Sequence, residues 1–318
     1  SGFIRGTDGE QAFRHGLAQE VVYDTLTFTD RRAMHHELAR HIEEEDQGRL
    51  GAVAGLLLHH YDRAGDAPKT VVYAAMSGDR AARVYANREA IDFYTRGLEA
   101  LDRAGGGGAD RSILLERIGT CLETQGRHSA ATEALQDALA RWRDRGRRKR
   151  GALLDGPVPD GAREAHLCRR IAVTYERGSA YDEALSWLDR ALAALPVRAG
   201  RVGSEVHASK SMTLYRKGEY REAIAWGRRA LSVAKRVGDA RAIAYAHNML
   251  ANSHIAEGSL RAAVRHLTEA VRLYDELEDV PGQAAANNNL GMCYHLMGEL
   301  DAALRHYELA GAADERVG

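Results

Sequence analysis

The chain has few cysteines, no long apolar run and no excess of charge of either sign. Its three cysteines, Cys121, Cys168 and Cys293, lie far apart and form no Cys-x-x-Cys pair, which argues against a disulfide framework or a zinc site. Lys and Arg number 44 against 45 Asp and Glu, so no overall charge attracts nucleic acid or a membrane. No apolar run approaches the roughly 18 residues of a membrane span. We expect a protein of the reducing cytoplasm.

Short motifs that carry catalysis or bind metals are also missing. No Gly precedes a Lys and a hydroxyl residue, as a phosphate-binding loop requires. The histidines of the segment His36 to His41 stand five residues apart, whereas two zinc ligands on one helix face stand four apart. Neither a Gly-x-Ser-x-Gly elbow nor a Cys-His arrangement occurs. We therefore expect no enzyme activity, no cofactor and no metal.

What the chain does contain is a recurring small residue. Six alanines set the register: Ala90, Ala131, Ala184, Ala223, Ala263 and Ala303. The residue twelve positions earlier is small in every copy: Gly78, Gly119, Ala172, Ser211, Ala251 and Gly291. The residue seven positions later is small as well: Gly97, Ala138, Ala191, Ala230, Ala270 and Ala310. Small side chains let helices approach closely, so the pattern predicts about six stacked helix pairs in an all-α solenoid.

The N-terminal segment, 1–48, differs from the rest. An Asp-Gly turn at residues 8 and 9 between short apolar runs predicts a β-hairpin. Two helices are expected to follow, at about 17–26 and 30–45, the second capped by Thr29 or Asp30. The chain also begins with Ser-Gly rather than Met, so we expect a piece of a longer protein. The predicted domains are a module at 1–48 and a solenoid at 49–318.

Part of this first module resembles the end of the winged-helix domain of bacterial STAND-type signalling ATPases. The residues that carry the resemblance are Phe13 to Leu17, Glu20 to Tyr23, Leu26, Arg31 to His35, and Leu38-Ala39. In that family the domain links a nucleotide-binding domain to C-terminal helical repeats. The resemblance implies that any ATPase or cyclase activity of a parent protein lies outside this chain.

The last copy of the repeat resembles a tetratricopeptide repeat. Leu290-Gly291, Tyr294, Ala303, Tyr307 and Ala310 match the positions of that family's characteristic residues. The family period is about 34 residues, whereas the last three copies here are spaced by about 40 residues, as are the longer repeats of regulators in the maltose-activator group. The resemblance implies a right-handed superhelix of helix pairs.

One insertion interrupts the array between Ala131 and Ala184. Its basic run, Arg141 to Arg150, holds seven positive charges and one negative, and a Gly-rich stretch with two prolines follows. We expect a lengthened helix end and an exposed loop at 143–163. A solvated loop explains this composition, and an anionic partner is the alternative. The run is the only candidate for nucleic-acid binding, which is otherwise not expected.

The free face of each first helix is expected to line a concave groove. Counting from the small residues places these side chains there: Arg169, Arg170, Tyr215, Arg216, Asn248, Asn252, Asn288, Asn289 and His295. An asparagine amide both donates and accepts, so it can pair with the backbone of an extended peptide, and arginines favour carboxylates. The alternative is that one or more asparagines, including Asn287, only cap or brace neighbouring helices.

These features predict a binding module rather than an enzyme. The expected function is a scaffold or sensor domain that binds a peptide segment or partner domain, including domains of the parent protein itself. The parent is expected to be a bacterial regulator of signalling or transcription. The alternative function is a receptor for a small ligand or signalling peptide that changes the conformation of the superhelix. No membrane partner is expected.

Overall fold

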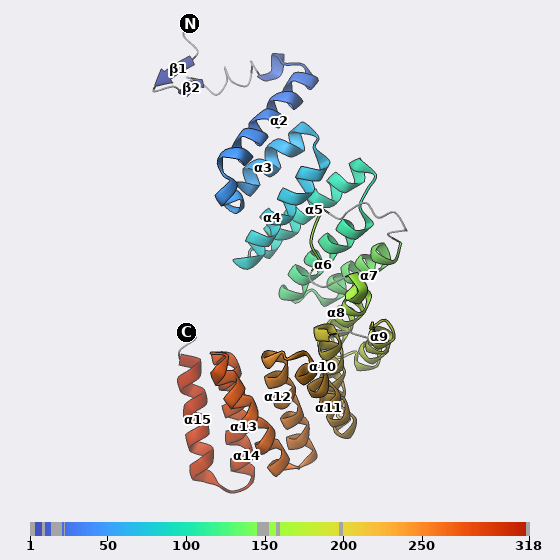
Figure 1. Cartoon of the computed structure of the whole chain (residues 1–318), viewed down its shortest axis with the longest axis vertical. Helices are drawn as coiled ribbons and strands as arrows, with labels where there is room; N and C mark the ends of the chain where they lie inside the picture. The colour runs from blue at the N-terminus through green and yellow to red at the C-terminus, as the bar shows by residue number, and fades with distance from the viewer. Residues whose placement is uncertain are drawn as a thin grey trace. The chain divides into compact units, whose positions relative to one another are not determined.

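The computed structural model describes residues 4–7, 10–13, 21, 23–144, 153–156, 160–196 and 200–315. Regular structure in these ranges is helical apart from one short hairpin (Figure 1). The chain divides into two compact units, residues 1–126 with 144–155, and residues 127–143 with 156–318. None of the helices in the described part is long and apolar enough to cross a membrane.

The first unit starts with the predicted hairpin. Strands β1 (Ile4–Thr7) and β2 (Glu10–Phe13) pair antiparallel, and the turn residues between them lie outside the described residues. The following elements are α2 (Phe28–Glu45), the 3₁₀ helix η1 (Gln47–Arg49), α3 (Leu50–Ala64), α4 (Ala67–Arg83), α5 (Asn87–Ala104) and α6 (Gly108–Thr124). Half of the helix predicted at 17–26 lies outside the described residues, and residues 21 and 23–25 are helical.

Helix α2 begins earlier than predicted. Thr27 is its N-cap: the Thr27 hydroxyl oxygen accepts from the backbone N of Asp30 at 3.1 Å and donates to Asp30 Oδ2 at 2.6 Å. The prediction of Thr29 or Asp30 as the cap is therefore wrong. A capping oxygen must reach an amide two or three residues ahead, and only Thr27 accepts from such an amide.

Helix α2 packs against α3 and α4 around one carboxylate. Glu43 Oε1 accepts from Lys69 Nζ and from the Tyr73 hydroxyl, both at 2.5 Å, and Glu43 Oε2 accepts from the Tyr61 hydroxyl. The Tyr61 and Tyr73 rings stack with centroids 5.6 Å apart. The predicted domain boundary at residues 48 and 49 lies between α2 and α3. The two predicted domains therefore contact each other through Glu43, and the boundary stays a prediction.

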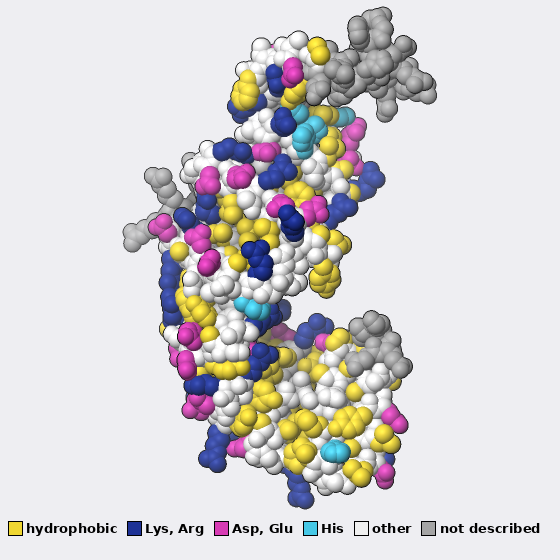
Figure 2. All heavy atoms as spheres, turned by 180° about the vertical axis from the view of Figure 1, so that it is seen from behind, with side chains coloured by type: hydrophobic (Ala, Val, Ile, Leu, Met, Phe, Trp, Pro, Cys, Tyr) yellow, Lys and Arg dark blue, Asp and Glu magenta, His cyan; other side chains and the backbone are white. Residues whose placement is uncertain are grey.

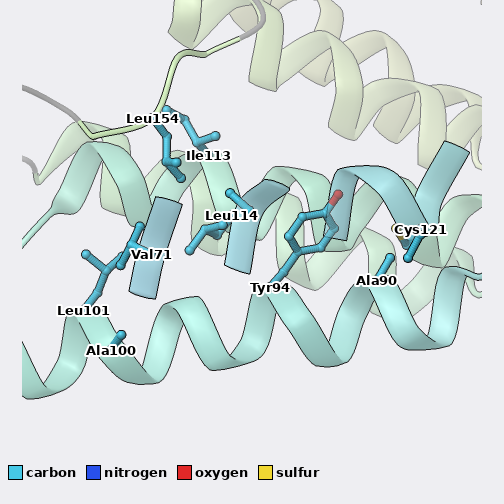
Figure 3. Packing of buried hydrophobic residues seen from close by; sticks show 11 residues of the cluster. Val71, Ala90, Tyr94, Ala100, Leu101, Ile113, Leu114, Cys121 and Leu154 are labelled. Carbon is cyan, nitrogen blue, oxygen red and sulfur yellow. The ribbon is translucent and has the colours of Figure 1, made fainter. Parts of the chain in front are cut away.

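The core of the first unit shows why the small residues recur. Tyr94 of α5 lies directly over Gly78 of α4, where a Cβ would come within 2.3 Å of the Tyr94 ring. Leu114 of α6 packs against Gly97, one turn further along α5, where a Cβ would stand 3.0 Å from Leu114 Cδ1. Figure 3 shows Tyr94, Leu114 and Cys121 lying between these helices. Tyr94 and Leu114 can approach the neighbouring helix this closely because Gly78 and Gly97 have no side chain.

The second unit is a run of consecutive helix pairs. Its elements are α7 (His128–Arg143), the 3₁₀ helix η2 (Asp160–Ala162), α8 (Arg163–Arg177), α9 (Tyr181–Ala193), α10 (Gly200–Lys217), α11 (Tyr220–Val237), α12 (Ala240–Glu257), α13 (Leu260–Glu276), α14 (Val280–Leu296) and α15 (Leu300–Glu315). Each helix packs on the next from α7 to α15. Helix α15 carries exposed leucines, and Figure 2 shows apolar side chains gathered over these C-terminal helices.

The predicted register of small residues is confirmed. All eighteen positions are buried. In the pair α10 and α11, Ser211 donates its hydroxyl hydrogen to the backbone oxygen of Ala223 at 2.7 Å. In the last pair, a Cβ on Gly291 would stand 2.7 Å from the Tyr307 ring. The prediction of an α-solenoid built from tetratricopeptide-like helix pairs is correct.

The insertion differs from its prediction at both ends. Helix α7 ends at Arg143 and Asp144 lies in a turn, so the expected lengthening of the helix is wrong. Leu154 is buried against Ile113 rather than exposed, as Figure 3 shows. The reason is Asp110 of α6, whose Oδ1 accepts from the backbone N of Leu153 at 2.8 Å and of Leu154 at 2.9 Å. Residues 145–152 and 157–159 lie outside the described residues.

Candidate protein-binding groove

The first helices of three successive pairs in the second unit line a groove of about 700 Å³. Its walls come from α8, α10 and α12, and Tyr274 of α13 and Asp279 before α14 close one end. The side chains that line it are Arg169, Arg201, Ser204, Glu205, Ala208, Ser209, Asp239, Arg241, Ala242, Tyr245, Tyr274 and Asp279. We call this surface the A-helix groove. It mixes charged, small and aromatic side chains.

Arginine and aspartate alternate along one edge of the groove with the period of the repeat. Arg201 Nε lies 3.9 Å from Asp239 Oδ2, and Arg241 Nε lies 3.8 Å from Asp279 Oδ2. Both aspartates are N-caps, with Oδ1 accepting from the backbone N of Ala242 at 3.0 Å or of Gly282 at 3.1 Å. Because one carboxylate oxygen holds its own helix and the other faces the preceding arginine, neighbouring first helices are linked at their N-terminal ends.

Two further ion pairs join α8 to α10, the first between residues that line the groove and the second beyond it. Arg169 lies 3.1 Å from Glu205, and Arg216 pairs with Glu176. Glu176 is buried, and burial raises the pKa of its carboxyl although Arg216 opposes the shift. Tyr245 of α12 lies within the field of the same charges, and burial raises the pKa of its hydroxyl. The groove therefore presents balanced charges around an aromatic side chain.

Three of the predicted asparagines meet between α12 and α14. Asn289 Nδ2 donates to Asn252 Oδ1 at 2.9 Å and to Asn248 Oδ1 at 3.2 Å. This network uses both hydrogens of one amide. Among the described residues, the Asn289 oxygen and the amide nitrogens of Asn248 and Asn252 have no hydrogen-bond partner and remain to pair with a ligand. Asn248 and Asn252 lie on the same face of α12 as Tyr245, at spacings of three and seven residues. The asparagine network thus shares a helix face with Tyr245 but lies beyond the residues that line the groove.

The remaining predicted residues are more scattered. Asn288 and His295 are exposed on α14, and Arg170 is half-buried on α8. The Tyr215 ring lies 5.9 Å from the Tyr220 ring within the pair α10 and α11. Of the nine predicted side chains only Arg169 lines the A-helix groove itself. Their role in binding stays a prediction.

Asn287 braces neighbouring helices, as the alternative prediction for the asparagines proposed. It is buried, its Nδ2 donates to the backbone oxygen of Gln283 at 3.0 Å, and its Oδ1 lies 2.9 Å from His306 Nδ1. The side chain braces α14 against α15. The equivalent pair one repeat earlier is His247 and His266, with their Nδ1 atoms 2.9 Å apart. Bracing was the alternative predicted for Asn287, whereas its partner His306 and the pair His247 and His266 were not predicted.

Sequence reasoning also missed most of the groove's charged edge. Arg201, Asp239, Arg241 and Asp279 were not among the predicted residues, although Arg201 and Arg241, like Asp239 and Asp279, are separated by the period of the repeat. This spacing is a readable signal. Counting from the small residue of each first helix selected residues near the middle of that helix. The residues that line the groove lie mostly toward the N-terminal ends of α10 and α12.

The comparisons with known proteins agree on the fold. Residues 206–276 and 242–316 match the family model of the tetratricopeptide repeat. No curated protein matches the chain. The matched part includes α11 to α15 and most of α10, and it therefore holds the asparagine network and the edge residues Asp239, Arg241 and Asp279.

Solved structures of low sequence identity share this architecture. The apo form of RapI is 12% identical, with a TM-score of 0.63 over 91% of this chain and 77% of that one. A Rap protein complexed with competence and sporulation factor is 15% identical, with a TM-score of 0.55 over 90% and 76%. A STAND protein with a tetratricopeptide repeat sensor, PH0952 from Pyrococcus horikoshii, is 14% identical, with a TM-score of 0.57 over 98% of this chain and 44% of that one. At these identities the likeness concerns the fold alone.

Proposed function

We propose that the second unit binds an extended segment of a partner protein in the A-helix groove, and that it does so as the interaction or sensor part of a larger regulatory protein. The observation that carries the proposal is the juxtaposition of two features on α12: the charged edge at its N-terminal end and the asparagine network further along. Amides that pair with a peptide backbone and arginines that pair with carboxylates are complementary means of holding an extended chain.

Solved structures of similar fold support this proposal. One neighbour is a Rap protein in complex with competence and sporulation factor, and another neighbour is described as carrying a tetratricopeptide repeat sensor in a STAND protein. The parent we propose is a regulator of that general kind, with its nucleotide chemistry outside these residues. We further propose that the chain acts by binding rather than catalysis, in a compartment that keeps Cys121, Cys168 and Cys293 reduced, because all three are free and buried.

The first experiment selects peptides from a displayed library of randomised twelve-residue segments. We expect selected peptides to bind the chain with one acidic residue placed against the arginine edge. Affinity measured by calorimetry should fall about tenfold or more when Asn252 and Asn289 are both changed to Ala. Changing Arg201 and Arg241 together to Ala should have a similar effect, because the acidic residue then loses its partners.

A matched control removes two exposed arginines elsewhere, with Arg261→Gln and Arg305→Gln, and should leave peptide affinity unchanged. Unaltered melting of every variant excludes a trivial loss of fold. If no peptide is selected, or if the control weakens binding as much as the groove variants do, the proposal is wrong. Detectable ATP hydrolysis by the isolated chain would also contradict it.

A small-ligand receptor is the second candidate, and the size of the groove is what favours it. A volume of about 700 Å³ lies within the range of small-molecule sites. Thermal-shift screening with charged metabolites separates the two candidates. A metabolite that stabilises the chain, and loses this effect in the Arg201→Ala and Arg241→Ala variant, would favour the receptor.

A further inference from the structure

The outward face of α11 concentrates positive charge in a chain whose formal net charge is −1. Five cations lie on its exposed positions: Arg221, Arg228, Arg229, Lys235 and Arg236. Glu222 is the one acidic residue within the helix. The equivalent positions of α13, one repeat later, include Glu269, Asp275 and Glu276, so the repeat does not impose this charge.

The cations form two rows along the helix. Arg221, Arg228 and Lys235 follow one another at seven-residue intervals, and Arg229 and Arg236 form the second row. Because a helix turns by about 100° per residue, Ala225 and Ser232 lie between the two rows. The buried face, which holds Ala223, Gly227, Ala230 and Ala234, is opposite. Two rows of cations, about 21 Å long, thus flank a ridge of small side chains.

Most of these cations have no carboxylate partner. Arg221 Nε lies 3.5 Å from Glu257 Oε1. Among the described residues, the other four have no acidic group within ion-pairing distance. Trp226 is no free stacking surface, because Lys210 Nζ and the Arg229 guanidinium each lie 4.3 Å from its ring centroid. The charges are therefore available to a ligand, and the aromatic ring is not.

The cations of α11 also act on the pKa values of two neighbouring histidines. After burial, which is the larger cause, Arg229 and Lys210 lower the pKa of His207 on α10. On the other side of the helix, Lys235 contributes to the lowered pKa of His247. Cations of α11 thus lower the pKa of a histidine on each neighbouring helix, and Glu269 opposes this effect at His247.

From this geometry we propose that the outward face of α11 binds the phosphate backbone of duplex DNA without reading its sequence. A row of guanidinium and ammonium groups neutralises phosphates and releases their counterions. Ala225 and Ser232 between the rows are too short to reach base edges, so the cations would contact the phosphates from outside the grooves. This binding is independent of the groove function proposed above, because α11 lies on the other side of the helix pair.

The composition of the face favours DNA over other anionic surfaces. A protein interface has an apolar centre, and a membrane-binding helix has an apolar face to insert. Between the two rows of α11 only alanine and serine are exposed. Duplex DNA carries one phosphate per about 1.7 Å of its axis, and two rows of cations about 21 Å long can follow such a regular backbone from outside the grooves. Duplex DNA is the polyanion that fits this ridge.

The test measures fluorescence anisotropy of a labelled 20-base-pair DNA duplex with the whole chain. We expect a Kd of about 1–100 µM at 100 mM salt, and an affinity that falls roughly 100-fold between 50 and 200 mM salt, as four phosphate contacts predict. Changing Arg228, Arg229, Lys235 and Arg236 together to Gln should weaken binding at least about tenfold at 50 mM salt. A duplex of scrambled sequence should bind equally well.

The matched control removes the same formal charge from exposed arginines elsewhere, with Arg83→Gln, Arg88→Gln, Arg261→Gln and Arg305→Gln, and should retain binding. Equal loss in this control, no binding by the unmodified chain, or strong preference for one sequence overturns the proposal. Tighter binding of poly-glutamate than of the duplex also overturns it, in favour of an acidic protein. Retained DNA binding by the Asn252→Ala and Asn289→Ala variant shows that the two proposals stand or fall separately.

Discussion

Arg241 of one repeat faces Asp279, the residue that caps the first helix of the next repeat, with Nε and Oδ2 3.8 Å apart. The same relationship joins Arg201 to Asp239 one repeat earlier at 3.9 Å. The aspartate serves two helices at once, because Oδ1 holds its own helix and Oδ2 faces the arginine. Capping is local, whereas the arginine contact depends on how consecutive repeats stack.

Changing Asp279 to Ala should destabilise the chain by about 1 kcal/mol, because the N-cap hydrogen bond to Gly282 is lost. Changing Arg241 to Ala should cost much less, about 0–0.5 kcal/mol, because its side chain is 68% exposed and the pair is long. Urea unfolding measures both values. Equal destabilisation by the two variants would show that the inter-repeat contact, and not the cap, carries the energy.

Gly78 should tolerate no larger residue. Gly78→Val places methyl groups against the Tyr94 ring, which already stands 2.3 Å from where a Cβ would be. We expect a loss of about 1–3 kcal/mol in the free energy of unfolding. Tyr94 has little room to move, because it is 2% exposed and its hydroxyl donates to Asp79 at 2.8 Å.

Gly55→Ala is the matched control for this substitution. Gly55 lies inside α3 with nothing within 4 Å of the added Cβ. Alanine has the higher helix propensity, so the variant should be more stable by about 0.5–1 kcal/mol. Opposite signs for the two glycines, measured by thermal or urea unfolding, would identify close helix approach as the reason for Gly78.

Mild acid should destabilise the pair α12 and α13 at a pH at which ordinary carboxylates are still ionised. Burial, helped by His247, His254, Arg265 and Arg228, lowers the pKa of His266 to about 4. A histidine whose pKa is lowered in the folded state binds a proton more readily when unfolded, so its contribution is complete above about pH 6.5 and is lost as pH falls toward 4. Between pH 7 and 5 we expect a loss of about 1 kcal/mol after solvent screening.

His247→Asn tests the origin of this pH dependence. In the next repeat Asn287 occupies the equivalent position and pairs with His306, with Oδ1 2.9 Å from Nδ1. The asparagine should keep a hydrogen bond to His266 while removing one titrating group. The unfolding free energy of the variant should therefore vary less between pH 7 and 5. An unchanged pH slope would mean that other histidines with lowered pKa values, such as His254 and His207, dominate instead.

Asp110 should hold residues 153 and 154 against α6. In Asp110→Ala the backbone amides of Leu153 and Leu154 lose their acceptor, so their hydrogen exchange should accelerate by tenfold or more, equivalent to about 1.4 kcal/mol. Asp110→Asn retains an oxygen at the same place and should change exchange less. If both variants exchange as slowly as the unmodified chain, burial of Leu154 alone holds this segment.

The helix pairs were readable because their signal is periodic and local. Small residues at fixed intervals predicted which helix faces touch, and Gly78, Ser211 and Gly291 each lie at such a contact. The start of α2 was missed by two or three residues, since Thr27, Thr29 and Asp30 are all good caps in isolation. Only the backbone path decides which of them reaches a free amide.

The positions of the candidate binding residues were predictable only in part. Asn248, Asn252 and Asn289 were predicted on one surface and meet there. Asn287, one residue from Asn288, turns instead toward His306, because adjacent helix residues point about 100° apart. Which of several neighbouring asparagines faces α12 depends on the exact rotation of α14, and no local pattern specifies that angle.

By itself the sequence determined that this chain is a stack of helix pairs, since burying small residues at a repeated spacing is a property of each helix and its neighbour. The tertiary structure alone decided where charges far apart in the chain meet: Arg241 with Asp279 at the groove edge, and Asp110 with the amides of Leu153 and Leu154. Such contacts depend on how whole helices rotate and stack, which is set by the sum of many packing contacts rather than by any single segment.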